Sequence, residues 1–129
     1  VAKTEDVLTP ELKKAGDFLI LLSIPKDENE IPDFNKIKEI YDAVYELNNK
    51  HLISAAYVLD SYGIVPGVAR MAFGNGFGVL FDDTLSGEEL FKNRMGDIVL
   101  ELSAEALLDM TIPFVLIGHV MKENFTYIY

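Results

Sequence analysis

The segment MAFGNGFGVLFDD, Met71–Asp83, has three glycines in five positions, which invites comparison with a phosphate-binding loop. Such loops follow a strand and precede a helix, so that the helix amino end faces the anion. Here the apolar spacing predicts a helix before the glycines and a strand, Phe77–Phe81, after them. The nearby helix end is the carboxyl end, which disfavours anions. We therefore interpret Gly74–Gly76 as a helix stop and turn, and a phosphate loop remains the alternative.

A better candidate for anion binding lies one helix earlier, where the predicted strand Leu52–Leu59 leads into a helix amino end. Backbone N–H groups at such an end lack intrahelical partners and can bind phosphate. The amides of Ser61, Tyr62 and Gly63 are therefore the predicted contacts to substrate or phosphate. Capping of the same helix end by Asp60 would use the same amides, and the sequence leaves the two interpretations open.

Arg70, on the helix that follows, is the predicted cationic contact of this site. Its use as an anion ligand depends on what the domain docks against, because an exposed helical arginine is otherwise a solvated charge. We expect it to contribute less to binding than the amides.

No catalytic group emerges from residue spacing. His51 and His119 are isolated, without the ligand spacing of a metal site, and are predicted to be a helix-end or surface residue and a strand residue. The serines include no G-x-S-x-G elbow, and the absence of cysteine excludes thiolate catalysis and disulfides within the chain. We predict neither a catalytic residue nor a metal site.

Two acidic stretches could hold a hard cation in principle. The first, Asp27, Glu28 and Glu30, is better explained as a solvated loop between prolines. The second, Asp82-Asp83, is explained equally well by a turn that ends a strand.

The formal net charge of −10 at pH 7 argues against nucleic acid as a partner, because backbone phosphates would be repelled. The apolar runs are too short to span a bilayer, and no basic segment precedes an apolar one as in a secretory signal. These features predict a protein that binds neither nucleic acid nor membrane, and they fit a cytoplasmic location.

Short apolar runs alternate with helical patterns along the 129 residues, which are enough for one domain with a sizeable core. The predicted strands are Phe18–Ile24, Leu52–Leu59, Phe77–Phe81, Asp97–Leu102, Phe114–Val120 and the closing FTYIY. The predicted fold is α/β (α+β), a single domain over 1–129 with a mixed β-sheet covered by helices. We expect parallel neighbouring strands where the first two helices connect them.

Capping residues predict the helix starts. Asp33 precedes an amphipathic helix that begins at Phe34, and Ser103 precedes a short helix that ends near Met110. Ser86 with Glu89 three residues later forms a capping-box pattern before another short helix.

The segment ISAAYVLDSYGIVPGVARMAFGNGFGVLF resembles the core of the C-terminal domain of the aminoimidazole ribonucleotide synthetase superfamily. Within that superfamily it is most similar to phosphoribosylformylglycinamidine synthase, in its long single-chain branch. The family pattern is an apolar strand, a His-Asp pair, a Ser-Asp-Gly-Gly turn, a helix and then Met-Ala-Phe-Gly. Met71–Gly74 matches the last element, at the family's interval from Gly63.

Further matches follow the family order along nearly the whole chain. Thr9–Leu22 resembles the segment that opens the domain, Glu89–Leu102 resembles a Leu-Phe-rich stretch before a strand, and Ile117–Val120 resembles the closing Ile-Gly-x-Val.

This chain departs from the family pattern at two places. Tyr57 and Val58 stand where the family has His-Asp, and one glycine is missing from the turn at Asp60–Gly63. The second departure bears directly on the predicted phosphate contacts.

The resemblance implies a part of an ATP- and glutamine-dependent ligase of purine biosynthesis. That enzyme converts formylglycinamide ribonucleotide to formylglycinamidine ribonucleotide. ATP and magnesium would bind mainly on a companion N-terminal synthetase domain, and ammonia would come from a glutaminase domain. The isolated domain is predicted to be inactive. The missing initiating methionine and the end in mid-strand lead us to expect a piece of a longer chain.

The alternative is a non-catalytic structural or dimerisation domain that has lost its ligand site. The departures at Tyr57-Val58 and in the turn support it, and under it a homodimer is the expected partner state.

Overall fold

The computed structural model describes residues 9, 11–24, 31, 33–73, 77–82, 84–122 and 126–127. The strands are β1 (Phe18–Leu22), β2 (Ile53–Val58), β3 (Gly78–Phe81), β4 (Ile98–Leu102), β5 (Val115–Met121) and β6 (Thr126–Tyr127). The helices are α1 (Phe34–Asn49), α2 (Ile64–Phe73), α3 (Gly87–Phe91) and α4 (Ala104–Leu107). The predicted α+β domain with a mixed sheet and covering helices is confirmed.

The six strands form one sheet in the order β2-β4-β1-β5-β3-β6. The first five strands pair antiparallel, and β3 pairs with β6 in parallel. The prediction of parallel neighbours joined by the first two helices is therefore wrong. The strands β1, β2 and β3 do run in the same direction, but β4 lies between β1 and β2, and β5 lies between β1 and β3.

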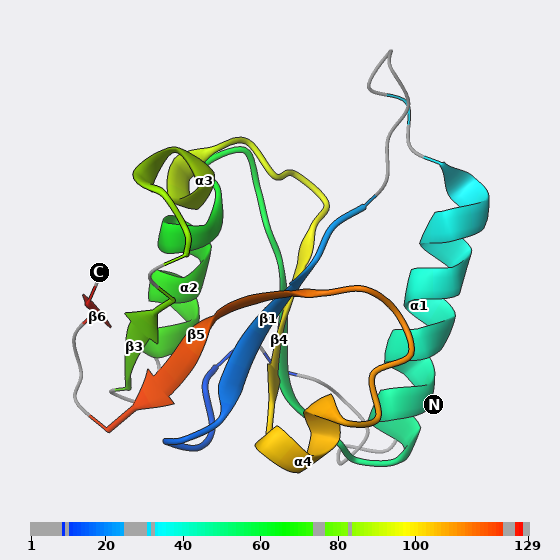
Figure 1. The fold of residues 1–129 in the computed structure, drawn as a ribbon, viewed down its shortest axis with the longest axis horizontal. Coiled ribbons are helices and arrows are strands. Elements are labelled where there is room, and N and C mark those ends of the chain that lie inside the picture. The colour runs from blue at the N-terminus through cyan, green and yellow to red at the C-terminus, as the bar shows by residue number, and fades with distance from the viewer. Residues whose placement is uncertain are drawn as a thin grey trace.

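Helices cover both faces of the sheet (Figure 1). One face packs against α2 and α3, and the other packs against α1 and α4. Successive residues of the central strand β1 point to opposite faces, so Leu19 and Leu21 join the first cluster while Ile20 and Leu22 join the second. A strand buried on both faces needs the continuous apolar run that this segment has.

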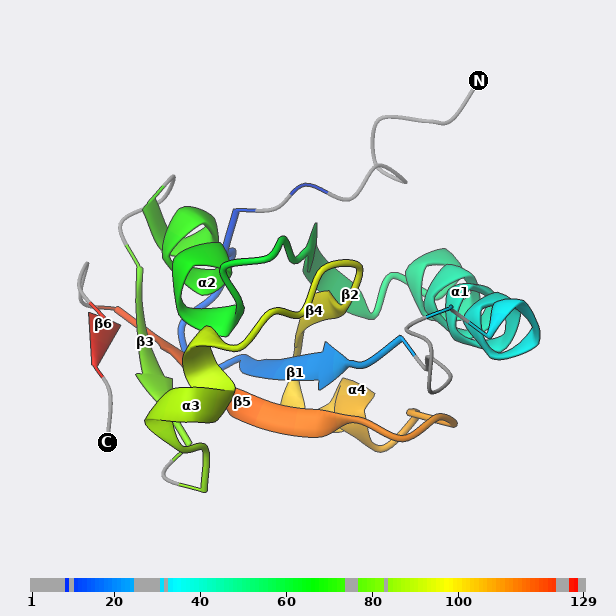
Figure 2. The same cartoon turned by 90° about the horizontal axis from the view of Figure 1, so that it is seen from above.

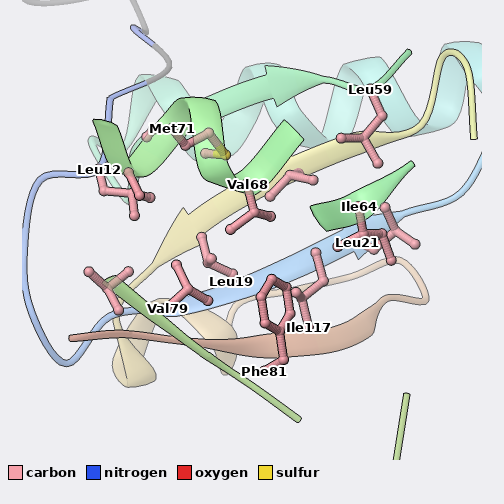
Figure 3. Close-up of a cluster of buried hydrophobic side chains, with 14 of the residues drawn as sticks. Leu12, Leu19, Leu21, Leu59, Ile64, Val68, Met71, Val79, Phe81 and Ile117 are labelled. Carbon is pink, nitrogen blue, oxygen red and sulfur yellow. The ribbon is translucent and has the colours of Figure 1, made fainter. Parts of the chain in front are cut away.

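The α2-side cluster is the core on which the candidate site rests. Side chains from α2, from the strands beneath it and from the segments that hold Leu12 and Leu59 point toward one another in Figure 3, and all of those named here are at most 2% exposed. They are Leu12, Leu19, Leu21, Leu59, Ile64, Val68, Met71, Val79, Phe81 and Ile117.

Helix α1 lies at the far side of the molecule from α2, as Figure 2 shows from above. Asp33 caps it as predicted, accepting hydrogen bonds from the N–H groups of Asn35 and Lys36. At its other end His51 has a left-handed φ of 58°, and the amides of His51 and Leu52 close the last turn on Asn48 and Leu47. The predicted helix-end role of His51 is confirmed.

The two short helices begin at their predicted caps. The Oγ atoms of Ser86 and Ser103 accept from the amides three residues on, Glu89 and Ala106. The reciprocal half of the capping box does not appear, because the Glu89 carboxylate binds Arg94 instead. Helix α4 ends earlier than predicted, at Leu107.

The glycine-rich segment Gly74–Gly76 lies outside the described residues. Around them the order is helix, then strand: α2 ends at Phe73 and β3 begins at Gly78. The stop-and-turn interpretation depends on this order of elements. The acidic stretch with Asp27, Glu28 and Glu30 also lies outside the described residues.

Candidate functional site

The predicted anion site is a tight turn between the end of β2 and the start of α2. The Asp60 carboxylate accepts a hydrogen bond from the Tyr62 amide, with 3.0 Å between N and Oδ1. The Gly63 amide donates to the Asp60 carbonyl over 3.4 Å. Two of the three predicted amides therefore already have a partner within the turn, as in the capping alternative. An anion at Tyr62 would have to displace a carboxylate.

Gly63 is required by the way this turn packs. Its φ is +94°, and a Cβ atom there would lie 2.6 Å from the carbonyl oxygen of Lys92 and 2.9 Å from the carbonyl carbon of Phe91. No side chain fits between these atoms. The glycine shared with the family pattern thus brings α2 against the end of α3.

Arg70 extends from the last turn of α2 back toward the turn. Its guanidinium donates to the Tyr57 hydroxyl over 3.2 Å and lies 4.0 Å from the Asp60 carboxylate. The hydrogen bond to Tyr57, and then the nearby charge of Asp60, raise the pKa of Arg70 above its already high value. The structure therefore brings Arg70 and the turn together, and Tyr57, which stands where the family has histidine, connects them.

The loop between α3 and β4 supports the turn from behind. Leu59 makes two backbone hydrogen bonds to this loop: its N–H donates to the Asp97 carbonyl, and its carbonyl accepts from the N–H of Gly96. The side chain of Arg94, 11% exposed, contacts Glu89 at 2.5 Å and Asp97 at 3.5 Å. Such a mostly buried ion cluster fixes the loop against which the turn packs.

Exposed apolar side chains surround the turn. Each is more than half exposed and each lies on a segment that adjoins the turn; they are Val58, Tyr62, Phe91 and Met95. Single exposed apolar residues need no explanation, but a group around one turn is typical of a contact surface.

The other sequence candidates have structural roles. His119 lies in β5, where its ring meets that of Phe18 edge-on, with 6.3 Å between centroids. Asp82 accepts from the amide and hydroxyl of Thr84 after β3, and these hydrogen bonds lower its pKa. Within the described part of the chain no three acidic, histidine or cysteine side chains form a metal site.

The sequence pattern did not identify Glu101, a buried carboxyl group with a raised pKa. Glu101 on β4 is 0% exposed and lies beside Asp17, which is 3% exposed. Burial, and then the hydrogen bond to Asp17, raise the pKa of Glu101 to about 7. The available signal was Glu101, an acidic residue among the apolar positions of the predicted strand Asp97–Leu102, but the same pattern is equally typical of a surface position.

A hollow of about 280 Å³ lies away from the turn, between α1 and the segment leading into β5. Its walls are mostly apolar and include Ile40, Ile112 and Phe114.

None of the described helices is long and apolar enough to cross a membrane.

No protein-family model matches the chain. A curated relative, the probable phosphoribosylformylglycinamidine synthase, chloroplastic/mitochondrial, of Arabidopsis thaliana, is 29% identical over 121 residues. The match includes 74% of this chain but only 8% of the plant protein.

Solved structures share the fold at low sequence identity. The Thermotoga maritima PurL structure complexed with ADP has a TM-score of 0.77 and 12% identity, covering 98% of this chain and 25% of PurL. The E. coli hydrogenase maturation protein HypE has a TM-score of 0.68 and 14% identity, covering 95% of this chain and 48% of HypE.

The chain thus corresponds to one part of much longer proteins. The similarity to the plant protein confirms the predicted resemblance to phosphoribosylformylglycinamidine synthase, and the solved structures show that the fold is shared with PurL and HypE.

Proposed function

We propose that this chain is the C-terminal-type synthetase domain of a phosphoribosylformylglycinamidine synthase. In the complete enzyme it would help to bind formylglycinamide ribonucleotide through the edge formed by Ser61, Tyr62, Gly63 and Arg70. The similarity to the plant synthase and the shared fold with PurL support the enzyme family. Thermotoga PurL has been solved with ADP, ATP and FGAR.

The observation that carries the proposed site is the position of the Arg70 guanidinium beside the start of α2. A cation and a helix amino end on one exposed edge suit the phosphate of a ribonucleotide. Asp60 now contacts both the Tyr62 amide and Arg70. A bound phosphate would replace Asp60 as the partner of these groups.

The remaining parts of the reaction belong to other domains in this proposal. ATP would supply the activating phosphoryl group, with magnesium, on a companion N-terminal domain, and a glutaminase domain would supply ammonia. In this proposal the described residues of this chain bind and orient the ribonucleotide, and none of them forms an acidic cluster of the kind that holds magnesium. The cytoplasm stays the predicted location.

The apolar residues around the turn are the proposed contact with the companion domain. Val58, Tyr62, Phe91 and Met95 would exclude water from the edge when that domain packs on them. Removing water would strengthen the attraction between Arg70 and a phosphate, which is weak on an exposed surface.

Calorimetric titration of the chain with formylglycinamide ribonucleotide, and separately with magnesium-ATP, tests the proposal. We expect saturable binding of the ribonucleotide, at least about tenfold weaker in Arg70→Ala because a charge-assisted contact is lost. Asp60→Asn should bind more tightly, since it removes the competing charge. Lys38→Ala, a remote exposed cation on α1, is the charge-matched control and should bind like wild type.

A Gly63 substitution is unsuitable for this test because it would disturb the turn itself. An Arg70→Ala variant that binds as well as wild type would contradict the proposed site. Heat from neither ligand would favour the alternative below.

The alternative function is a structural or dimerisation domain without a ligand site. It is favoured by the Tyr62 amide, which Asp60 already satisfies, and by exposed aromatic residues on α1, among them Phe34 and Tyr45 at 73% and 67%. Sedimentation equilibrium separates the two functions. A dimer that Phe34→Ser dissociates supports the alternative, and a monomer without ligand binding contradicts both the ligand site and the dimer.

A further inference from the structure

The buried acidic pair Asp17–Glu101 lies away from the proposed ligand edge. Glu101 lies on strand β4, between Leu19 of β1 and Ala55 of β2. Asp17, two positions before Leu19, lies on the same face of the sheet beside Glu101, and its side chain raises the pKa of Glu101. The Oδ2 atom of Asp17 has no hydrogen-bond partner in the part of the chain that the structure describes.

Glu101 also holds the loop that contains Asp17, residues 12–17. Its carboxylate accepts from the amides of Lys13, at 2.9 Å, and Lys14, at 3.0 Å. Backbone bonds fasten the two ends of the loop: Leu12 donates to Met71 at the end of α2, and Gly16 donates to Val120 of β5. The loop is therefore bound to α2 and β5 by backbone hydrogen bonds and to β4 by one buried acid.

Few other charges face this pair among the described residues. The Lys13 ammonium is directed to Thr9 and Glu11, and Glu105 of α4 lines the same surface hollow as Lys14 and Asp17. The strand residues that pair with Glu101 are apolar. No described cation compensates two negative charges inside.

Two neighbouring carboxylates buried away from water cannot both ionise without a large cost, so Glu101 retains its proton more readily than an exposed glutamate does. Burial and Asp17 raise the pKa of Glu101 to about 7, whereas the Lys13 and Lys14 amides act in the opposite direction. Loss of the proton would leave adjacent like charges, and the repulsion would be relieved if Asp17 moved out to water with its loop.

We propose that Asp17 and Glu101 form a proton-dependent latch that holds loop 12–17 on the sheet while the pair is protonated and releases it when the proton is lost. Release would also free the end of α2 from Leu12. The latch does not depend on the proposed ligand site.

The direction of the pH dependence follows from proton binding to the closed and open states of the loop. The closed loop binds the proton with a pKa of about 7 at Glu101, and the open loop with the ordinary value of 4.5. The extra stability of the closed loop is therefore fully present below about pH 4.5 and is lost as the pH rises through about 7. Linkage gives about a tenfold fall in the closed-to-open ratio from pH 6 to pH 8.

Amide hydrogen exchange followed by NMR tests the latch. After correction for intrinsic exchange, we expect the protection of the Lys13 and Lys14 amides to fall about tenfold from pH 6 to pH 8, as linkage requires. The β4 amide of Leu100 should stay constant as an internal reference. Glu101→Gln should abolish the pH response, while Glu105→Gln, the matched control beside the same hollow, should keep it.

Constant protection of the Lys13 and Lys14 amides across this range would overturn the latch. An equal fall in their protection in the Glu101→Gln variant would also overturn it. An equal fall at Leu100 would also overturn it, because the pair would then act on the whole domain. If Glu101→Gln does not fold, the carboxyl ¹³C shift of Glu101 in the unmodified chain decides. A midpoint near 7 supports the latch and a midpoint near 4.5 overturns it.

Discussion

The two sides of the sheet differ in how completely their helices are packed. On one side, α2 buries Ile64, Val68 and Met71 completely within ten residues. On the other side, α1 is sixteen residues long and buries only Ile40 and Leu47. Its aromatic residues are at least half exposed instead.

This difference shows where the constraints on the sequence are concentrated. The segments that resemble the synthetase family include β2, α2 and the turn between them, where Gly63 and Met71 have no room to change. Helix α1 needs only a narrow apolar stripe, so its outer face is free to vary or to meet a partner. The following variants break or sharpen this contrast.

The largest effect is expected inside the α2-side core. Met71→Ala should lower the free energy of unfolding by about 3 kcal/mol, because removing this fully buried side chain leaves a cavity in the core. Met95→Ala, at a position 58% exposed, is the control and should change it by less than about 0.5 kcal/mol. Urea denaturation measures both, and similar values for the two variants would contradict the packing described.

A smaller loss is expected at the turn. Gly63→Ala should cost about 2 kcal/mol because φ is positive and the new methyl group meets the Lys92 carbonyl. Gly87→Ala, in α3 with open space around it, should instead be neutral or stabilise by about 0.5 kcal/mol. Thermal denaturation of the pair checks this, and a neutral Gly63→Ala would show that the turn can relax.

At the end of α1 a gain in stability is expected. His51→Gly should raise the free energy of unfolding by about 0.5–1 kcal/mol, because glycine adopts the left-handed conformation without strain. His51→Ala keeps the strain and should not stabilise. A destabilised glycine variant, measured by urea denaturation, would mean that the histidine side chain itself contributes to the helix end.

The smallest effect is expected on the outer face of α1. Tyr45→Ser, at a position 67% exposed, should change the free energy of unfolding by less than about 0.5 kcal/mol. The measurement is urea denaturation at low and high protein concentration. A loss that appears only at high concentration would indicate a dimer through this face.

Local features were predictable from the sequence because they depend on a few neighbouring residues. The caps Asp33, Ser86 and Ser103 and the fully apolar strand at Phe18 belong to this class. The strand order was not predictable, since the apolar sequence of a buried strand does not indicate which strand pairs with it. For the same reason the pairing of Asp17 with Glu101, 84 positions apart in the chain, could not be foreseen.

The candidate site was predictable in part. The family pattern indicated the turn at Asp60–Gly63 and the helix after it, and the structure brings Arg70 to the same edge. The partner of the Tyr62 amide and the neighbours of Gly63 depend on local geometry and on packing against α3, which spacing alone does not reveal.

The most direct test of the proposed ligand edge is a map of amide chemical-shift changes when formylglycinamide ribonucleotide is added to the ¹⁵N-labelled chain. We expect the largest changes at Ser61, Tyr62 and Gly63, a smaller change at Arg70, and none along α1. Changes confined to α1, or no saturable change at the turn, would contradict the proposal that this edge binds the substrate.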